Sequence, residues 1–264
     1  MLFRSLPWTV PVGNGEITIQ TMVDQERRAN INTADSAMLE QSLVLMGVDA
    51  GDYSVIVNSI LDWIDPDNNT RLDGAEEDFY QASEPPYLPK NGPIDDITEL
   101  LLIKGIRENP DIFYGPGTNS ALPSRINKRT NPRLGFNADV PVYPVGLKDL
   151  FTPVSSGRIN LNTADVTVLQ MIPGMDERMA SEVIRLRAGP DGTGMVPLNN
   201  PGELINAGIP PNVVQQMSRY ADVRSRTFEV TVDARIGESK GKFRALLIRN
   251  NPRDIQVTGF RKVE

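Results

Sequence analysis

The residues best suited to chemistry in this sequence are the carboxylates of the loop 65–78, which reads DPDNNTRLDGAEED. With Asp65 as the first position of a calcium-binding loop, oxygen ligands fall at alternate positions, and Glu76 at the end can bind through both carboxylate oxygens. The predicted ligands are Asp65, Asp67, Asn69, Arg71 (through its backbone carbonyl), Asp73 and Glu76. Because Ca²⁺ takes about six to eight oxygen ligands, this spacing predicts a structural Ca²⁺ ion. A second ion, or completion of the first site, would use Glu77, Asp78, Asp95 and Asp96.

The loop departs from the EF-hand pattern at its sixth position. Thr70 stands where an EF-hand has glycine, and Gly74 falls elsewhere. The alternative interpretation is a solvated acidic loop that caps helix ends, as most charge runs do. Close carboxylates repel one another unless a cation is present, so we favour calcium over this alternative.

The composition excludes several kinds of chemistry. The 264 residues include neither cysteine nor histidine, so disulfides, thiol catalysis, and the commonest general base and zinc ligand are excluded. The formal charge of −7 argues against a protein whose main partner is a phosphate backbone. A glycosidase-like carboxylate pair or a Ser/Lys pair would remain for catalysis, but no stretch arranges Ser or Lys for it, and a calcium loop and helix caps explain the carboxylates better. We therefore predict a protein that is not an enzyme, with a secreted calcium-dependent hydrolase as a weaker alternative.

A short sequence motif occurs twice in the chain and precedes similar predicted elements each time. Residues 30–35 read NINTAD and residues 160–165 read NLNTAD, and each copy precedes a pattern of helix, tight turn and second helix. We expect Asn32 and Asn162 to cap the first helix of each unit, with Asp35 and Asp165 three residues on in its first turn. The turns carry Gly47 and Gly174, which supply a positive φ, and then Asp49 and Asp176, which can cap the second helix. The expected apolar stripes of the second helices are Tyr53, Ile56, Ile60 and Ile64 in one unit, and Met179, Val183, Ile184 and Leu186 in the other.

The second unit resembles the helix-hairpin-helix modules that bind DNA through backbone N–H groups at a Gly-x-Gly turn. Here Asp49 and Asp176 replace the second glycine, which puts a carboxylate where a phosphate would lie. The basic residues nearby are few (Arg178, Arg185 and Arg187), and no aromatic platform accompanies them. We favour a helical packing module and keep DNA binding as an alternative.

The remaining segments predict strands at both ends of the chain. Residues 15–23 alternate polar and apolar residues, and the loop before them contains Pro7, Pro11 and Gly13. Three more strands are expected at 228–236, 242–250 and 254–263. A short apolar helix is expected at 97–106 and ends on Gly105, 107–157 should be irregular, and 202–220 should form two short helices with Gly208 between them. We expect the first strand to pair with the last ones, in one αβ sheet domain that holds a large helical insertion.

Taken together, several stretches resemble the K-class minor pseudopilin of type II secretion systems. They are PWTVP and GEITIQ near the start, NINTAD, WIDPD…GAEEDFY within 62–80, ITELLLIKGI, INLNTAD and the closing strands. The resemblance implies an α+β fold: a pilin-like αβ domain with an antiparallel sheet, formed by 1–27 and 221–264. A large inserted α-helical domain, 28–220, would carry the calcium loop and two helix-hairpin-helix-like units. Calcium binding in the family carries over only to Asp65, Asp67 and Glu76.

The resemblance also implies a place and partners for the protein. It suggests the periplasmic domain of an inner-membrane-anchored protein of the Gram-negative envelope, at the tip of the pseudopilus. There it would bind the I-class and J-class minor pseudopilins to start and cap assembly for protein secretion. Further contacts with the H class and the major pseudopilin are implied, and nucleic acid is not. The family's N-terminal hydrophobic helix is missing from the sequence, and the membrane contact is expected to be made by that helix alone.

Overall fold

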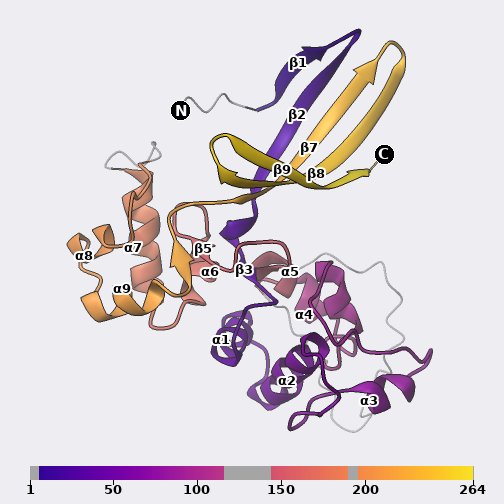
Figure 1. Ribbon diagram of the computed structural model, residues 1–264. Helices are drawn as coiled ribbons and strands as arrows, with labels where there is room; N and C mark the ends of the chain where they lie inside the picture. Colours follow the sequence, from indigo (N-terminus) through magenta and orange to yellow (C-terminus); the bar gives the residue numbers. More distant parts are fainter. Residues whose placement is uncertain (1–5, 116–143, 190–195, 264) are drawn as a thin grey trace, which may run out of the picture. The chain divides into compact units, whose positions relative to one another are not determined.

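The computed structural model describes residues 6–115, 144–189 and 196–263. The chain divides into two compact units (Figure 1). The sheet unit lies within 1–30, 154–169 and 178–264, and the helical unit lies within 31–153 and 170–177. Residues 154–169 and 178–220, which we expected in the inserted domain, thus group with the sheet. In the described part of the chain, no helix has the length and hydropathy needed to cross a membrane.

A five-stranded antiparallel sheet with the order β1-β2-β7-β8-β9 forms most of the sheet unit. Its strands are β1 (Trp8–Val12), β2 (Gly15–Asp24), β7 (Thr227–Ile236), β8 (Ser239–Asn251) and β9 (Asp254–Lys262). The predicted pairing of the first strand with the last ones is confirmed, since β2 pairs with β7 from Gly15↔Ile236 to Asp24↔Phe228. The loop expected around Pro11 is instead the edge strand β1, where a proline is tolerated because an edge strand leaves some N–H groups unpaired.

Short elements complete the sheet unit. They are the 3-10 helix η1 (Gln25–Arg27), β3 (Ala29–Asn30), β5 (Ile159–Asn160), α6 (Val166–Gln170), α7 (Glu177–Ala188), α8 (Glu203–Asn206), α9 (Pro211–Met217) and β6 (Ala221–Asp222). The two short helices predicted at 202–220 are confirmed as α8 and α9, and Gly208 between them has a φ of +83°.

The helical unit is built around α2, whose apolar stripe is buried. Its elements are α1 (Ser36–Met46), η2 (Ala50–Asp52), α2 (Tyr53–Ile64), α3 (Glu77–Gln81), η3 (Ile97–Leu102), α4 (Asp111–Tyr114), α5 (Leu147–Leu150) and β4 (Phe151–Thr152). Ile56, Ile60 and Trp63 are buried, and the Trp63 ring lies edge-on to Tyr80 at 5.3 Å. The predicted helix 97–106 is a 3-10 helix that ends at Leu102, because Ile103 is extended and Gly105 takes a φ of +87°. Of the segment expected to be irregular, 116–143 lies outside the described residues.

The structure corrects the helix-capping roles that we expected for the repeated sequence motif. The N-cap of α1 is Asp35, whose Oδ1 accepts from Met38 N at 2.9 Å, and Asp165 accepts from Val168 N in the same way. Asn32 instead accepts from Ile94 N and donates to Ile94 O, and Asn162 makes the same pair of bonds with Leu198. Each asparagine amide therefore bonds both backbone groups of one distant residue, as a neighbouring strand would. The aspartate in the same motif caps the helix.

Candidate functional site

The acidic loop is organised around Asp62, a residue of α2 that the sequence analysis did not select. Its carboxylate is fully buried and accepts from Ala75 N at 2.9 Å and from Arg71 Nη1 at 2.7 Å. Gly74 lies so close that a Cβ there would come within 2.0 Å of Asp62 Oδ2. The loop thus folds back onto the end of α2, and no spacing rule within 65–78 could have revealed this, because Asp62 precedes the motif.

Three of the predicted ligands form the outward turn of the loop. Asp65 Oδ1 accepts from Asp67 N at 3.4 Å, and Asp67 Oδ1 accepts from Asn69 N at 2.8 Å. These bonds make successive Asx-type turns, in which each side chain bonds the backbone two residues on. Asn91 holds the turn from outside by donating to the Asp67 carbonyl at 3.0 Å.

Arg71 and Asp73 differ from the roles expected of them. The Arg71 guanidinium forms ion pairs with Asp62 and Asp65, which raise the pKa of Arg71, and its carbonyl accepts from Gly74 N. Asp73 lies in the left-handed region with a φ of +61°, and its carboxylate accepts from Ser54 Oγ at 3.1 Å. The structure therefore places an internal cation, the Arg71 side chain, between the Asp62 carboxylate of α2 and the Asp65 carboxylate of the loop.

Glu76 is the most unusual carboxylate of the loop. Its side chain is buried at 4 % exposure, and neither carboxylate oxygen has a hydrogen-bond partner in the structure. Burial, and after it the nearby negative charges of Asp62, Asp65 and Asp67, together raise the pKa of Glu76 to about 7. A buried carboxylate without a partner is costly, and a bound cation is one of the ways in which proteins compensate it.

The loop residues fit a cation at Glu76 and do not form a closed cage. In the residues that the structure describes, no group of three or more acidic side chains converges closely enough to hold one metal ion. Asp62 and Asp65 already share the positive charge of Arg71. Asp67 and Asn69 lie on the exposed turn, where oxygen atoms could reach an ion at Glu76 only by local rearrangement. The orphaned Glu76 is the observation that favours a cation here.

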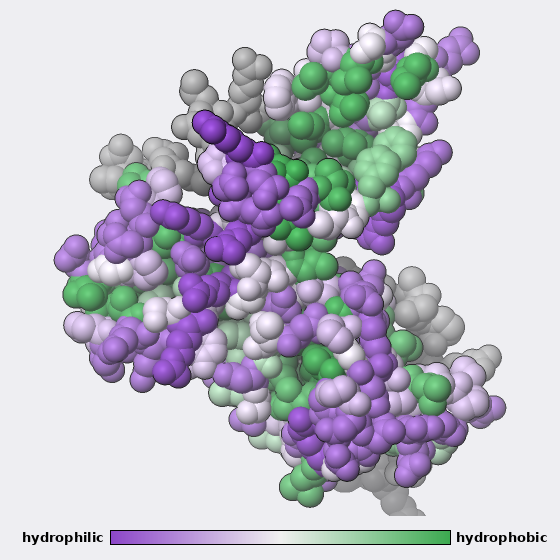
Figure 2. All heavy atoms as spheres, in the orientation of Figure 1, coloured by the Kyte–Doolittle hydropathy of each residue, from purple (hydrophilic) through white to green (hydrophobic). Residues whose placement is uncertain are grey.

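The five-stranded sheet has one continuous apolar face, which is buried at Val230, half-buried over most of its length and exposed on β9. Residues paired across strands share a face, and one such row runs Trp8, Ile19, Val232 and Phe243. The next row is Met22, Val230, Ala245 and Phe260, and the third contains Phe228, Leu247 and Val257. Phe243 and Phe260 stack at 5.1 Å on this face. We call these three rows the apolar sheet face; Figure 2 shows apolar side chains gathered over the sheet.

Exposure separates the apolar sheet face from an ordinary core. Phe260 is 65 % exposed and Val257 is 62 % exposed, whereas large apolar side chains of a sheet normally pack against a second layer. The opposite face is mixed: it carries Leu246 and Ile248, but also polar contacts, since Gln20 donates to Asp233 at 2.6 Å and Arg244 pairs with Glu229 at 3.5 Å. An apolar face of this extent marks an interaction surface in a folded protein.

In the first of the two helical repeats, the turn does not offer the phosphate site of a helix-hairpin-helix module. Asp49 caps the short helix η2, and its Oδ1 accepts from Gly51 N at 2.8 Å. The backbone donor that would bind a phosphate is therefore already occupied by a carboxylate. Gly47 and Gly174 take the predicted positive φ values of +76° and +83°.

Comparisons with known proteins point to one family. The family model described as type II secretion system (T2SS), protein K matches residues 17–110. Type II secretion system protein K of Pectobacterium carotovorum subsp. carotovorum is 26% identical over 257 residues, which cover 90% of this chain and 67% of that protein. A putative type II secretion system protein K of Escherichia coli K12 is 45% identical over 67 residues, 25% of this chain and 20% of that protein. The match to Klebsiella pneumoniae type II secretion system protein K is 42% identical over 48 residues, which are 18% of this chain and 15% of the relative.

A solved structure shares the fold. The match is to the crystal structure of the GspK-GspI-GspJ complex from the type 2 secretion system of enterotoxigenic Escherichia coli. The TM-score is 0.63 at 19% identity, and the alignment covers 98% of this chain and 84% of the other. The mixed helix-and-strand architecture with an antiparallel sheet is thus shared with a protein of known structure.

Proposed function

We propose that this chain is a K-class minor pseudopilin of a type II secretion system and that it acts at the tip of the pseudopilus, as its similarity to protein K of such systems suggests. There it would bind the I-class and J-class minor pseudopilins, start pseudopilus assembly and cap it. The site of action would be the periplasm, with an anchor in the inner membrane. The protein would work by binding and carry out no catalysis.

The apolar sheet face is the observation that carries this proposal. Pseudopilin partners would supply apolar surface to cover it, because burial of apolar area is the main favourable term in association. The edge strands β1 and β9 flank this face, and Trp8 on β1 is 43 % exposed. Aromatic side chains contribute much of the energy of protein interfaces, so we assign Trp8 to the partner surface.

The finer description of the fold belongs to the same proposal. A pilin-like sheet domain would carry the partner surface, and the helical elements inserted into it, with two helix-hairpin-helix-like units, would form a bulky cap. The described helical pairs α1–α2 and α6–α7 support such units by their repeated sequence and their glycine turns.

A structural calcium ion in the acidic loop is the second part of the proposal. Glu76, Asp65, Asp67 and Asn69 would hold it, with Asp73 and the Arg71 carbonyl completing the oxygen set. When bound, the ion would supply the positive charge that the buried Glu76 lacks and would order 65–78. Metal content after dialysis, measured by plasma mass spectrometry, tests this part: about one or two calcium ions per chain are expected, and none after dialysis against excess Ca²⁺ would overturn it.

Size-exclusion chromatography with light scattering tests the partner proposal. The chain is mixed with soluble I-class and J-class pseudopilins, with Ca²⁺ or with chelator, and a stable three-protein complex is expected. Val257→Asp places a charge on the apolar sheet face and should abolish the complex, whereas Gln256→Asp places the same charge on the opposite face of β9 and should not. Equal effects of the two variants, or no complex for the unaltered chain, would refute the assignment.

Two alternative functions are addressed by the same samples. A gel-shift assay with duplex DNA tests helix-hairpin-helix binding, for which salt-sensitive retention would be required. A glycan panel tests a calcium-dependent hydrolase, for which turnover would be required. The Asp49 cap on η2 argues against the first, and no observation favours the second.

A further inference from the structure

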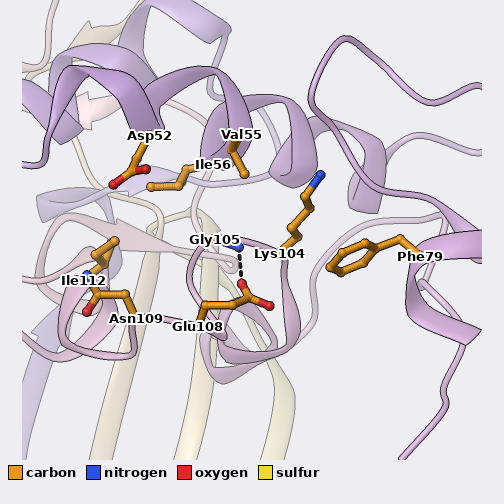
Figure 3. A pocket seen from close by; sticks show the side chains of 9 residues that line it. All are labelled: Asp52, Val55, Ile56, Phe79, Lys104, Gly105, Glu108, Asn109 and Ile112. Atoms are coloured by element: carbon orange, nitrogen blue, oxygen red, sulfur yellow. Dashed lines mark hydrogen bonds between the residues drawn. The ribbon is translucent and has the colours of Figure 1, made fainter. Parts of the chain in front are cut away.

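A cavity in the helical unit lies beside α2. It has a volume of about 370 Å³ and is enclosed on one side by α2 and on the other by the segment 104–112. Val55, Ile56 and Ile112 provide apolar lining, while Asp52 and Glu108 bring carboxylates to it (Figure 3). Lys104 also lines the cavity, which therefore combines an apolar surface with two acidic groups and one basic group.

The backbone of the segment 104–112 is fitted closely to α2. Gly105 has a φ of +87°, and a Cβ on it would come within 2.8 Å of Ile56 Cγ1. The Gly105 N–H donates to Glu108 Oε2 at 2.5 Å, as the dashed line in Figure 3 shows. This bond fixes the Glu108 carboxylate at the cavity and leaves its second oxygen available to a ligand.

Neither carboxylate has an ion-pair partner among the described residues, although Lys104 lines the same cavity. Asp52 is exposed at the start of α2, where its side chain makes no capping bond, and neither it nor Glu108 forms an ion pair with a described residue. The basic side chains nearest in the sequence, Lys104 and Arg107, bond to backbone carbonyls and to neither carboxylate. Lys104 Nζ donates to the carbonyls of Asp73 and Gly74 at 3.0 and 2.9 Å, and Arg107 donates to the Glu84 carbonyl at 3.1 Å.

We propose that this cavity binds a lysine or arginine side chain of a partner protein. The alkyl part of the side chain would lie on Val55, Ile56 and Ile112, and its cationic head would bond to Asp52 and Glu108. Lysine and arginine combine an apolar stem with a charged tip, which matches this lining. Hydrogen bonds between a cation and a carboxylate are the stronger kind, and an anionic ligand would be repelled by both carboxylates. A purely apolar ligand would cover the two carboxylates without replacing their water, at a cost in affinity.

The inference does not depend on the apolar sheet face, which belongs to the other unit. Its test is also separate, because it uses blocked amino acids and no pseudopilin partner. N-acetyl-lysine methylamide is titrated into the full chain and followed by backbone amide shifts in NMR spectra. N-acetyl-norleucine methylamide, which has the same stem length in carbon atoms and no charge, is the control ligand.

The lysine probe should produce saturable shifts at 52–56 and 104–112, with a Kd in the millimolar range, as expected for so small a contact, about −3 to −4 kcal/mol. The affinity should fall at least about tenfold in the double variant Asp52→Asn/Glu108→Gln, which removes an interaction of about 1.4 kcal/mol or more. Glu108→Gln keeps an oxygen that can accept from Gly105 N, so the segment keeps its fold. The double variant Glu40→Gln/Asp78→Asn neutralises two exposed carboxylates outside the cavity and should leave the affinity unchanged.

Salt provides a test that needs no variant. Raising NaCl to high concentration should weaken the lysine probe severalfold and leave the norleucine probe unaffected, because salt screens partly exposed charges. Equal shifts with the two probes, unchanged affinity in the Asp52/Glu108 variant, or the absence of saturable shifts at these residues would each overturn the proposal.

Discussion

Replacing Glu76 by glutamine should stabilise the metal-free protein at high pH and remove its response to calcium. The structure buries the Glu76 carboxylate without a hydrogen-bond partner and raises its pKa from an ordinary value of 4.5 to about 7. Between these two pH values the folded state binds more protons than the unfolded state. The free energy of unfolding therefore falls as the pH rises through this window and stays lowered above it.

The magnitude follows from the size of the pKa change. Each pKa unit corresponds to about 1.4 kcal/mol, so ionising Glu76 in the folded, metal-free protein costs about 3 kcal/mol above pH 7. Glu76→Gln removes this cost. In chelator at pH 8 the variant should be about 2–3 kcal/mol more stable than the unaltered chain, and at pH 4.5 the two should be nearly equal. A bound Ca²⁺ ion would offset the same cost, so calcium should raise the melting temperature of the unaltered chain and not that of the variant.

Urea unfolding at pH 4.5 and pH 8, with Ca²⁺ and with chelator, measures all four stabilities. Glu40→Gln is the matched control, because Glu40 is an exposed acid on α1 and belongs to no proposed calcium site. This control should change neither the pH dependence nor the calcium response. The reasoning would be refuted if Glu76→Gln destabilised the metal-free protein equally at both pH values, or if calcium stabilised the variant as much as the unaltered chain.

Three further substitutions test the fold around the sites. Glu26 is fully buried, and its carboxylate accepts from the backbone N–H groups of Ser156, Arg226 and Thr227. Glu26→Ala should therefore lower the free energy of unfolding, measured in urea, by about 3–5 kcal/mol. A loss under about 1 kcal/mol would contradict the hydrogen-bonding role. Gly105→Ala should lower thermal stability by about 2 kcal/mol more than Gly208→Ala, since both have a positive φ but only Gly105 lies against Ile56. Asn162→Ala should cost about 2–3 kcal/mol in urea unfolding, because it leaves three part-buried bonds to Leu198 and Val223 unmade. The cap variant Asp165→Ala should cost about 1 kcal/mol, and equal losses would argue against the bridging role of the asparagine.

Local patterns predicted the elements whose cause is local. Alternation of apolar residues located β2, β7, β8 and β9, and the glycines at 47, 174 and 208 located turns with positive φ. These predictions worked because side-chain periodicity and the freedom of glycine are properties of a short stretch. The same reasoning failed for β1, because its pairing with β2 outweighs the proline at position 11.

The candidate metal site was predicted in part. The spacing of Asp65, Asp67 and Asn69 predicted a turn of alternating oxygens, and the structure has Asx-type turns there. It did not predict Asp62 as the organising carboxylate or Arg71 as its ion partner, because both depend on the loop folding back onto α2. Whether calcium occupies the loop stays a prediction.

The sequence by itself determined the repeated helix pairs, the closing strands, the family resemblance and the exclusion of thiol and imidazole chemistry. All of these follow from residue type and from spacing along the chain. Only the tertiary structure decided that Asn32 and Asn162 bridge to distant backbone, that Glu76 is buried without a partner, and that the apolar sheet face is only partly buried. The physical reason is that burial and hydrogen-bond partners depend on segments 36 to 201 residues away, which no local pattern can place.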